Sequence, residues 1–441
     1  DVLNKCKNAL LFLPYIMCFA FVFLSAVVCD ALSTCVLMCV FVLALPFAGH
    51  VTLALALGVV GQGFFKSMPY TLLSALYQKP HDAKKLDVSF TLYYLSIQIG
   101  GLLPLLFSGV IAHYWGYRAA FFIAAIGMEI GFFTFLYGKR LLTMVDNRAS
   151  TSSVSTQFQM LLVSAIILAT ALFSICLRYT FLTNLFVGVA AIAIFVYICF
   201  ECRRYSKQEV NQVAVAMFLM VLGAIFFAIY YQQPTSLTLF VERNVNRQLL
   251  GITLPSASFW VFNPMWMLLL GPLLSYAYNF LSKRNKDLSV VMKFGIGNMC
   301  MGLGYFIVVI AARYFSYHYH VSAWWIVLSY AFQSTAELLV NALGFAMVAR
   351  LSPKPMMSVM MGMWLVSTAL GGVLSGTMAS MTAIPKTHMH AAYSLHVYAH
   401  AFGIFGWLSM ITGVLTCLVA PFVMRFMHAV PEPQSKLALE M

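Results

Sequence analysis

The chain has 441 residues, of which 62% are hydrophobic and only 9% are charged. A soluble domain averages about 25% charged residues, so this composition excludes an ordinary soluble fold. Apolar runs of about 20 residues, each long enough to cross a bilayer, recur from end to end. The composition therefore predicts an all-α polytopic membrane protein, because a transmembrane β-barrel would show short alternating segments instead.

The apolar runs predict membrane spans near 8–28, 31–47, 51–72, 88–112, 118–138, 156–177, 181–200, 210–240, 254–280, 289–312, 322–349, 355–380 and 397–424. The formal net charge is +13. When the loop "LYQKPHDAKKLD" is placed in the cytoplasm, most Lys and Arg residues fall in loops on that same side. The positive-inside rule accounts for this asymmetry. The basic charge therefore predicts a cytoplasmic C-terminus and a lipid bilayer as partner, and it does not indicate a nucleic acid.

Polar stretches divide the chain into two helical blocks. The interruption "GKRLLTMVDNRASTSSVSTQ" ends the first block, and "ECRRYSKQEV" leads into the second. Between them lie two evenly apolar segments, which is typical of helices that face lipid on several sides. We predict an N-terminal bundle, a linker with a two-helix insertion, a C-terminal bundle and a cytoplasmic tail, with bounds at 1–140, 141–209, 210–427 and 428–441.

The cysteine and histidine residues form no strong metal or redox motif. Most of the ten cysteines lie in apolar runs, where cysteine behaves as a small hydrophobic residue. The segment "CFEC" at 199–202 has CxxC spacing but no second pair nearby. Two HxH pairs, His318/His320 and His388/His390, lie in predicted outer loops. We expect no metal and no cofactor, and the absence of HExxH and GxSxG motifs indicates that the protein is not an enzyme.

Charged residues at membrane depth are rare and point to function. Lys66 lies in "GQGFFKSMPY", near the end of a predicted span. A charge at that depth costs at least about 2.5 kcal/mol unless it meets a partner or a water-filled cavity. Asp30 lies at the inner end of the first predicted span, where it is either an interfacial carboxylate or part of a functional site.

Glu337 lies in "FQSTAELLVNALG", inside an otherwise apolar predicted helix. Gln333, Ser334 and Asn341 share its face, because the four residues fall at i, i+1, i+4 and i+8. Such a stripe lines either a wet pathway or a polar contact between helices, and we favour the pathway.

Two predicted helices of the second block contain proline. The segment "YYQQPTSL" places Gln232 and Gln233 before Pro234, which breaks the hydrogen-bond ladder of a helix. The segment "FWVFNPMWMLLLGP" contributes Asn263 and Trp266 beside two further prolines. Interrupted helices are tolerated in lipid where they line a cavity or pack against neighbours, and both interpretations remain open here.

Several of these segments follow the order of motifs in one known family. "GQGFFKSMPYTLLSALY" and "DVSFTLYYLSIQIGGLLPLLF" are similar to the family patterns GxGxFKxNPSSLL and FxxYYxSINIGS. "YYQQPTSLTLFVERNV", "FWVFNPMWMLLLGPLL" and "WWIVLSYAFQSTAELLVNALGFAMVARL" then follow in the family's order. From about residue 8 to 425, the chain resembles the proton-dependent oligopeptide transporters of the major facilitator superfamily.

The resemblance implies the major facilitator superfamily fold, two six-helix bundles, with the two extra helices that prokaryotic members carry between them. The first predicted span then matches the family's second helix, so we expect a first helix with an ExxER motif to be missing from this sequence. Asp30 takes the place of the aspartate in the loop GDxxLGRR, whose glycine and basic residues are missing here. Lys66 matches the lysine that pairs with the ExxER glutamates, and protonation of such a partner would release it.

The resemblance also assigns roles around a bound peptide. Glu337 is expected to meet the peptide's amino group with help from Asn263, while Lys66 contributes at the carboxylate end. Gln98 and Met68 stand where the family usually has asparagine, so peptide preference is expected to differ. The residues expected to line the site are Tyr93, Tyr94, Gln98, Gln233, Asn263, Trp266, Ser334, Glu337 and Trp364, and those expected to act in proton coupling or gating are Asp30, Lys66, Pro234 and Glu337.

We therefore expect a monomeric proton-coupled symporter that imports di- and tripeptides across a bacterial inner membrane by alternating access. Within the family, the alternatives are a transporter of a non-peptide metabolite, an exporter, and a homologue that does not transport. A proton-gradient-dependent uptake measurement with a labelled dipeptide distinguishes among them.

Overall fold

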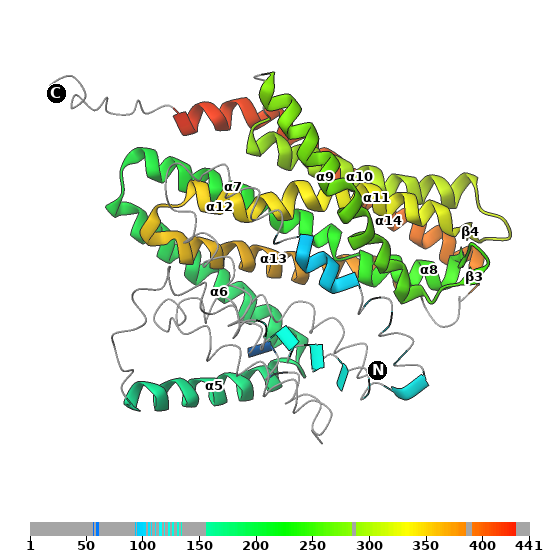
Figure 1. Ribbon diagram of the computed structural model, residues 1–441, viewed down its shortest axis with the longest axis horizontal. Coiled ribbons are helices and arrows are strands. Elements are labelled where there is room, and N and C mark those ends of the chain that lie inside the picture. The colour runs from blue at the N-terminus through cyan, green and yellow to red at the C-terminus, as the bar shows by residue number, and fades with distance from the viewer. Residues whose placement is uncertain are drawn as a thin grey trace.

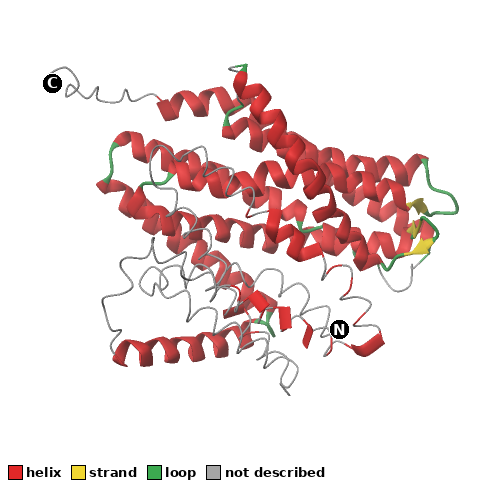
Figure 2. Ribbon diagram, in the orientation of Figure 1, coloured by secondary structure: helices red, strands yellow, loops and turns green. Residues whose placement is uncertain are grey.

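Residues 156–284, 288–384 and 390–428, together with scattered positions between 56 and 134, are described by the computed structural model. Among these residues, seven helices are long and apolar enough to cross a membrane: Thr180–Arg204, Lys207–Asn244, Ser256–Leu274, Val290–Tyr314, Ala323–Leu351, Met357–Thr382 and Ala391–Arg425. Helix α5 (Thr156–Cys176) precedes them (Figures 1 and 2). Every span predicted between 156 and 428 is thus found as a helix, and the prediction of a helical membrane protein is confirmed for this part of the chain.

Helix α6 (Thr180–Glu201) has one buried face and one exposed face. Val187 and Ile194 lie on the buried face, which contacts α13 (Met357–Ala379). Phe181, on the other face, is 74% exposed. Because both faces are apolar, the exposed one suits contact with lipid, as the even composition of this segment predicted.

Helix α7 (Lys207–Tyr230) begins at a capping box and ends at a break. The Ser206 hydroxyl accepts a hydrogen bond from the Glu209 backbone N–H at 3.4 Å, and the Glu209 carboxylate accepts one from the Ser206 backbone N–H at 3.0 Å. These bonds satisfy backbone donors that the first turn leaves without helical partners. After Tyr230 the chain passes through a π-helical turn, Gln233–Leu237, into α8 (Thr238–Asn244).

The other helices run back and forth beside α7 and α13 (Figure 1). Their bounds are α9 (Phe262–Lys283), α10 (Val290–Tyr314), α11 (Ala323–Glu337), α12 (Leu343–Leu351) and α14 (Ala391–His428). A second π-helical turn, Leu338–Ala342, joins α11 to α12 within one span. Helix α14 begins before the predicted position 397, and a 3₁₀ turn at Ser256–Val261 precedes α9.

Glycines allow α10 and α14 to approach closely. A Cβ atom on Gly302 would lie 2.8 Å from the Gly406 carbonyl oxygen. A Cβ atom on Gly413 would lie 2.7 Å from the Gly295 carbonyl oxygen. No larger residue fits at these points without moving a backbone. The contact therefore resembles the small-residue interfaces that hold membrane helices together by van der Waals packing.

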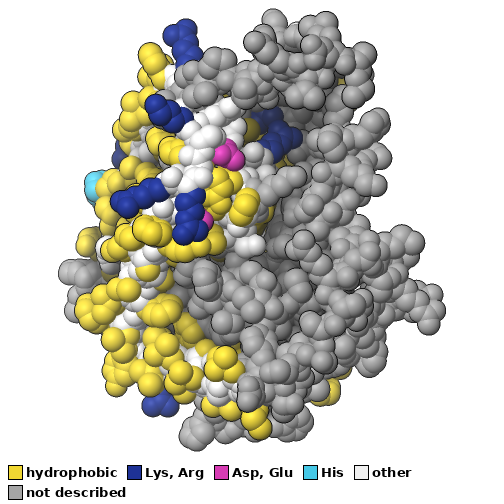
Figure 3. Space-filling model, turned by 90° about the vertical axis from the view of Figure 1, so that its left-hand side faces the viewer, with side chains coloured by type: hydrophobic (Ala, Val, Ile, Leu, Met, Phe, Trp, Pro, Cys, Tyr) yellow, Lys and Arg dark blue, Asp and Glu magenta, His cyan; other side chains and the backbone are white. Residues whose placement is uncertain are grey.

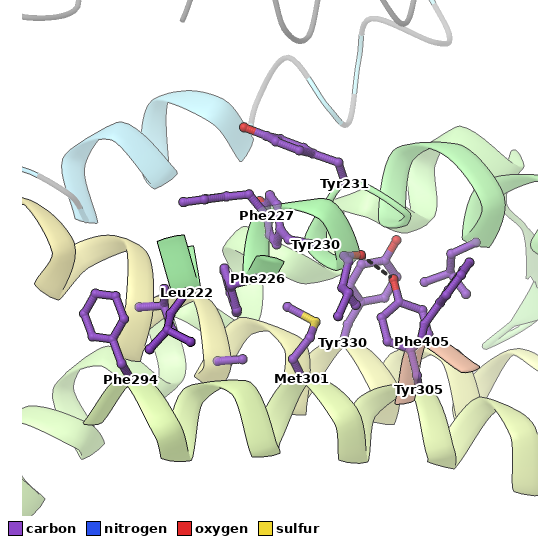
Figure 4. Packing of buried hydrophobic residues seen from close by; sticks show 14 of the residues in the cluster. Leu222, Phe226, Phe227, Tyr230, Tyr231, Phe294, Met301, Tyr305, Tyr330 and Phe405 are labelled. Carbon is purple, nitrogen blue, oxygen red and sulfur yellow. Dashed lines mark hydrogen bonds between the residues drawn. The ribbon is translucent and has the colours of Figure 1, made fainter. Parts of the chain in front are cut away.

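Aromatic side chains fill the space between α7, α10 and α11 (Figure 4). Phe226 and Tyr230 stack with ring centroids 6.1 Å apart, and Phe226 is fully buried. The buried Tyr305 hydroxyl donates to the Ile229 carbonyl oxygen at 3.0 Å, so its polar atom is satisfied inside an apolar core. This core holds α7 in place just before its break.

Short β-strands, which the sequence did not predict, occur in loops at one end of the helices (Figure 2). Strand β1 (Val245–Asn246) pairs in parallel with β4 (Val321–Ser322). Strand β2 (Gln248–Leu249) pairs antiparallel with β3 (Ile252–Thr253) through a turn in which Leu250 and Gly251 have φ of 50° and 82°. Two-residue strands are too short to show a period in the sequence, and the β1–β4 pair forms only when two distant loops meet.

The loops alternate between two ends of the molecule, as the predicted topology requires. In Figure 1, the α6–α7 and α12–α13 connections lie at the left, and β3 and β4 lie at the right. Figure 3 faces the left end and shows Lys and Arg side chains spread over its described part. Arg203 and Arg204 are exposed in the α6–α7 connection, and Arg350 is exposed in the last turn of α12. This distribution agrees with the predicted positive face, while its assignment to the cytoplasm stays a prediction.

Candidate functional site

Three polar side chains from three spans meet inside the described bundle. The Asn263 side-chain amide on α9 donates to the Glu337 carboxylate on α11 at 3.0 Å and contacts the Gln233 amide oxygen at 3.3 Å. Glu337 and Asn263 are each 3% exposed and Gln233 is fully buried. A buried carboxylate is costly unless it is hydrogen-bonded, and the bond from the Asn263 amide reduces that cost. We call Gln233, Asn263, Ser334 and Glu337 the carboxylate site.

Neighbouring hydrogen bonds hold the carboxylate site in position. The Ser334 hydroxyl donates to the Asn263 backbone carbonyl at 3.1 Å and ties α11 to the start of α9. The Asn341 side-chain amide donates to the second Glu337 oxygen at 3.4 Å. Both carboxylate oxygens therefore face amide donors. Gln233, by contrast, has a buried side-chain nitrogen for which the described part of the chain supplies no acceptor.

The break at Pro234 places Gln233 against α9. Proline has no N–H, so carbonyl groups in the preceding turn lose their helical donors. The Thr235 hydroxyl donates to the Tyr231 carbonyl at 2.8 Å, and the Thr238 hydroxyl donates to the Gln233 carbonyl at 2.9 Å. Threonine hydroxyls thus replace part of the missing ladder. As the sequence predicted, the helix is interrupted here, but its role in gating stays a prediction.

Gln232 belongs to a second buried polar cluster, at the contact of its own span with α13. Its side-chain nitrogen donates to the Ser375 carbonyl at 2.9 Å, and its side-chain oxygen accepts from the Ser236 hydroxyl at 2.7 Å. The Ser236 and Thr382 hydroxyls lie 3.0 Å apart. Sequence reasoning grouped Gln232 with Gln233. Consecutive residues at a helix break point to different neighbours, and only the packed structure shows which.

The polar stripe predicted around Glu337 divides in two. The Gln333 side-chain nitrogen donates to the Ser329 hydroxyl at 2.7 Å, and that hydroxyl donates to the Gly304 carbonyl on α10 at 2.7 Å. Gln333 is fully buried there. The expectation that all four stripe residues line one pathway is therefore wrong for Gln333, since close packing at Gly304 turns it toward α10. Ser334, Glu337 and Asn341 do cluster at the carboxylate site.

The two tryptophans expected at the site lie in different surroundings. Trp266 is half-buried, and its indole N–H donates to the Val327 carbonyl at 2.9 Å. Because the polar atom of the ring is bonded, the rest of the ring is available only for apolar contacts. Trp364 is fully buried, with its ring centroid 5.8 Å from that of Phe227, and a Cβ atom on Gly344 would overlap it. Trp364 is thus part of the helix packing in this structure. For both tryptophans, peptide binding stays a prediction.

The remaining expected site residues belong to the N-terminal block. Tyr93 and Gln98 are half-buried, and Tyr93 packs against the main apolar core. Asp30, Lys66 and Tyr94 lie outside the described residues, so their predicted roles stay predictions.

The described residues hold no group of three His, Cys, Asp or Glu side chains that could bind a metal ion. Cys199 and Cys202 are free thiols. The His320 ring nitrogen lies 2.9 Å from the His318 carbonyl oxygen, so this HxH pair contacts its own backbone. His388 lies outside the described residues.

Comparison with known proteins identifies the family. The model described as PTR2: POT family matches residues 16–396. Dipeptide and tripeptide permease B of Aliivibrio fischeri (strain MJ11) is 32% identical over 375 residues, which cover 85% of this chain and 75% of the relative. These matches agree with the resemblance that the motifs carry.

Solved structures support the same conclusion. A bacterial homologue of the human drug peptide transporters PepT1 and PepT2 matches with a TM-score of 0.77 and 25% identity, over 96% of this chain and 90% of that chain. Tetrameric PepTSo2 matches with a TM-score of 0.76 and 25% identity, over 96% of this chain and 91% of that chain. The chain is therefore a membrane transporter of the POT family.

Proposed function

We propose that this protein is a proton-coupled symporter that imports di- and tripeptides by alternating access. The observation that carries the proposal is the carboxylate of Glu337, which is 3% exposed and lies where α11 ends in a π-helical turn. Ionisable groups at such depth mark substrate or ion pathways. A carboxylate selects a cationic group on its ligand. Relatives named as dipeptide and tripeptide permeases support the assignment of that group as the ammonium group of a peptide.

The carboxylate site suits one end of a peptide zwitterion. Glu337 accepts the ammonium group, and Asn263, whose amide lies 3.0 Å from the carboxylate, assists through a hydrogen bond. Trp266 presents the face of its ring, because its N–H is bound to Val327. Lys66 acts at the peptide's carboxylate end and in proton coupling. Tyr93, Tyr94 and Gln98 line the facing side, and Asp30 and Pro234 act in gating.

The proposed architecture is two six-helix bundles of the major facilitator superfamily with a two-helix insertion within 141–209. The peptide-transporter homologue that matches over 96% of this chain supports this arrangement. We propose that the protein works in a bacterial inner membrane with a cytoplasmic C-terminus, as the basic loops indicate. We also propose a monomer, although the matched PepTSo2 structure is of a tetramer. Light scattering on the detergent-purified protein measures the oligomeric state.

Uptake into proteoliposomes tests the proposed function. Radiolabelled dialanine is added to vesicles that hold the protein, with and without an inward proton gradient. The proposal expects accumulation above the external concentration, which a protonophore abolishes. Dialanine that equilibrates without accumulating would refute proton coupling. If dialanine does not enter at all while the protein is folded, the peptide substrate is refuted, and a non-peptide substrate or a homologue that does not transport is favoured.

A further inference from the structure

Two spans that contribute to the carboxylate site contain a π-helical turn at the site itself. The first turn, Gln233–Leu237, begins at Gln233, and the Leu237 N–H reaches back to the Gln232 carbonyl at 2.8 Å. The second turn, Leu338–Ala342, begins immediately after Glu337. π-helical turns are rare, and they interrupt the regular ladder frequently at functional sites. Because kinks in helices often occur at π-bulges, the site residues lie at two points about which their helices can bend.

The half-helices on one side of these turns are connected to each other. Helix α8 follows the first turn and α11 precedes the second, and strands β1 and β4 pair their outer ends at Val245 and Val321. The buried Asn244 amide, at the end of α8, donates to the Tyr319 carbonyl at 3.1 Å and to the Ala391 carbonyl at 2.8 Å. Because the strand pairing and the bond to Tyr319 join the end of α8 to the segment that leads into α11, α8 and α11 are expected to move together about the two turns.

Asn263 is the side chain that connects the two turns directly. Its amide nitrogen contacts Gln233 at 3.3 Å, where the first turn begins, and donates to Glu337 at 3.0 Å, where the second begins. Glu337 also accepts from Asn341, which lies inside the second turn, at 3.4 Å. The same carboxylate therefore bonds both to α9 and across its own π-helical turn.

We propose that the Asn263 amide, through its contacts with Gln233 and Glu337, restrains both turns until a ligand's ammonium group binds Glu337 and displaces the amide. We call this restraint the latch. This inference rests on the proposed function, since it needs a cationic ligand at Glu337. Glu337 is 3% exposed, so a ligand reaches it only when the groups covering it shift. The Asn263 amide is a neutral donor, whereas an ammonium group adds a full charge opposite to that of the carboxylate, so the ligand competes favourably with the amide. Substrate binding thereby loosens the turns about which the half-helices move.

Hydrogen exchange at the two turns measures the latch. Peptides covering 231–238 and 337–343 are followed by mass spectrometry in the parent protein, without ligand, with saturating dialanine, and with N-acetyl-dialanine. The latch predicts that dialanine raises exchange about tenfold at both turns, because the bonds that restrain them are lost, and that the acetylated peptide does not. Unchanged or slower exchange at either turn with bound dialanine would overturn the latch.

A variant that lacks the Asn263 amide tests the latch independently of ligand binding. In Asn263→Ala, both turns are expected to exchange about tenfold faster than in the parent, and dialanine should raise exchange no further. Gln333→Met is the matched control, since it removes a different buried amide, on α11, that bonds Ser329 and lies outside the carboxylate site. Parent-like exchange in a folded Asn263→Ala protein would overturn the latch. If that variant does not fold, the exchange of the parent with the two peptides decides.

The outcomes separate the latch from the proposed function. Dialanine binding is measured on the same samples by thermal shift. Binding with no change at the turns refutes the latch and leaves the symporter proposal standing. Faster exchange in ligand-free Asn263→Ala, together with no binding of dialanine to the parent, supports the latch as a structural element and refutes the peptide ligand.

Discussion

Replacement of Glu337 by glutamine tests whether this carboxylate receives the amino group of the substrate. The substitution keeps the shape of the side chain and removes its negative charge. In the parent, the two carboxylate oxygens face the Asn263 amide at 3.0 Å and the Asn341 amide at 3.4 Å. In Glu337→Gln, an amide NH₂ group replaces one oxygen, so one of these two donors meets another donor. We therefore expect both weaker ligand binding and a modest loss of stability.

The magnitude follows from the bond that is weakened. A hydrogen bond to a charged group contributes about 1.5–3 kcal/mol, and each 1.4 kcal/mol changes a binding constant by about tenfold. Dialanine should therefore bind Glu337→Gln about ten to a hundred times more weakly than it binds the parent. N-acetyl-dialanine has no ammonium group. It should bind the parent weakly and lose little further affinity in the variant.

The assay measures binding of both peptides to both proteins by competition with a labelled dipeptide. Gln333→Met serves as the control, because Gln333 is buried on the same helix but bonds Ser329 near α10. It should lower thermal stability and leave the ratio of the two affinities unchanged. Equal losses for the free and the acetylated peptide in Glu337→Gln would show that the carboxylate acts only in helix packing, and would remove it from the binding site.

Three further substitutions test other parts of the reasoning. Lys66→Ala should abolish proton-driven accumulation of dialanine and leave some exchange across the membrane, and accumulation at the parent level would show that Lys66 only packs or reaches the interface. Gly344→Ala should lower the thermal unfolding temperature, because overpacking against Trp364 costs about 1–3 kcal/mol. Gly403→Ala should not lower it, because a Cβ atom there would meet no neighbouring side chain within 4 Å. Equal unfolding temperatures for the two variants would contradict the packing at Gly344. Gln232→Leu removes buried hydrogen bonds to Ser375 and Ser236, each of which contributes about 0.5–1.5 kcal/mol, so it should also lower the unfolding temperature. An unchanged value would show that these bonds contribute nothing to stability.

The positions of the helices could be predicted from the sequence because lipid imposes a local rule. A span of about 20 apolar residues satisfies its own backbone hydrogen bonds, so its existence depends on no distant contact. Spans predicted near 289–312 and 322–349 are observed as Val290–Tyr314 and Ala323–Leu351. The break at Pro234 was predictable for the same reason, since proline removes a local donor. The π-helical turn after Glu337 has no proline, and no local signal predicted it.

The partners of each polar side chain depended on the tertiary structure. Periodicity placed Gln333, Ser334 and Glu337 on one face of a helix. It did not show that α10 and α9 divide that face between them, so that Gln333 bonds Ser329 while Glu337 bonds Asn263. The pairing of β1 with β4 likewise joins loops far apart in the chain. Composition, period and motif are properties of neighbouring residues, so the lipid environment, the spans and the family could be predicted without knowing how the helices pack. Contacts between distant residues exist only after the helices pack, so the residues that share a site could be identified only in the folded structure.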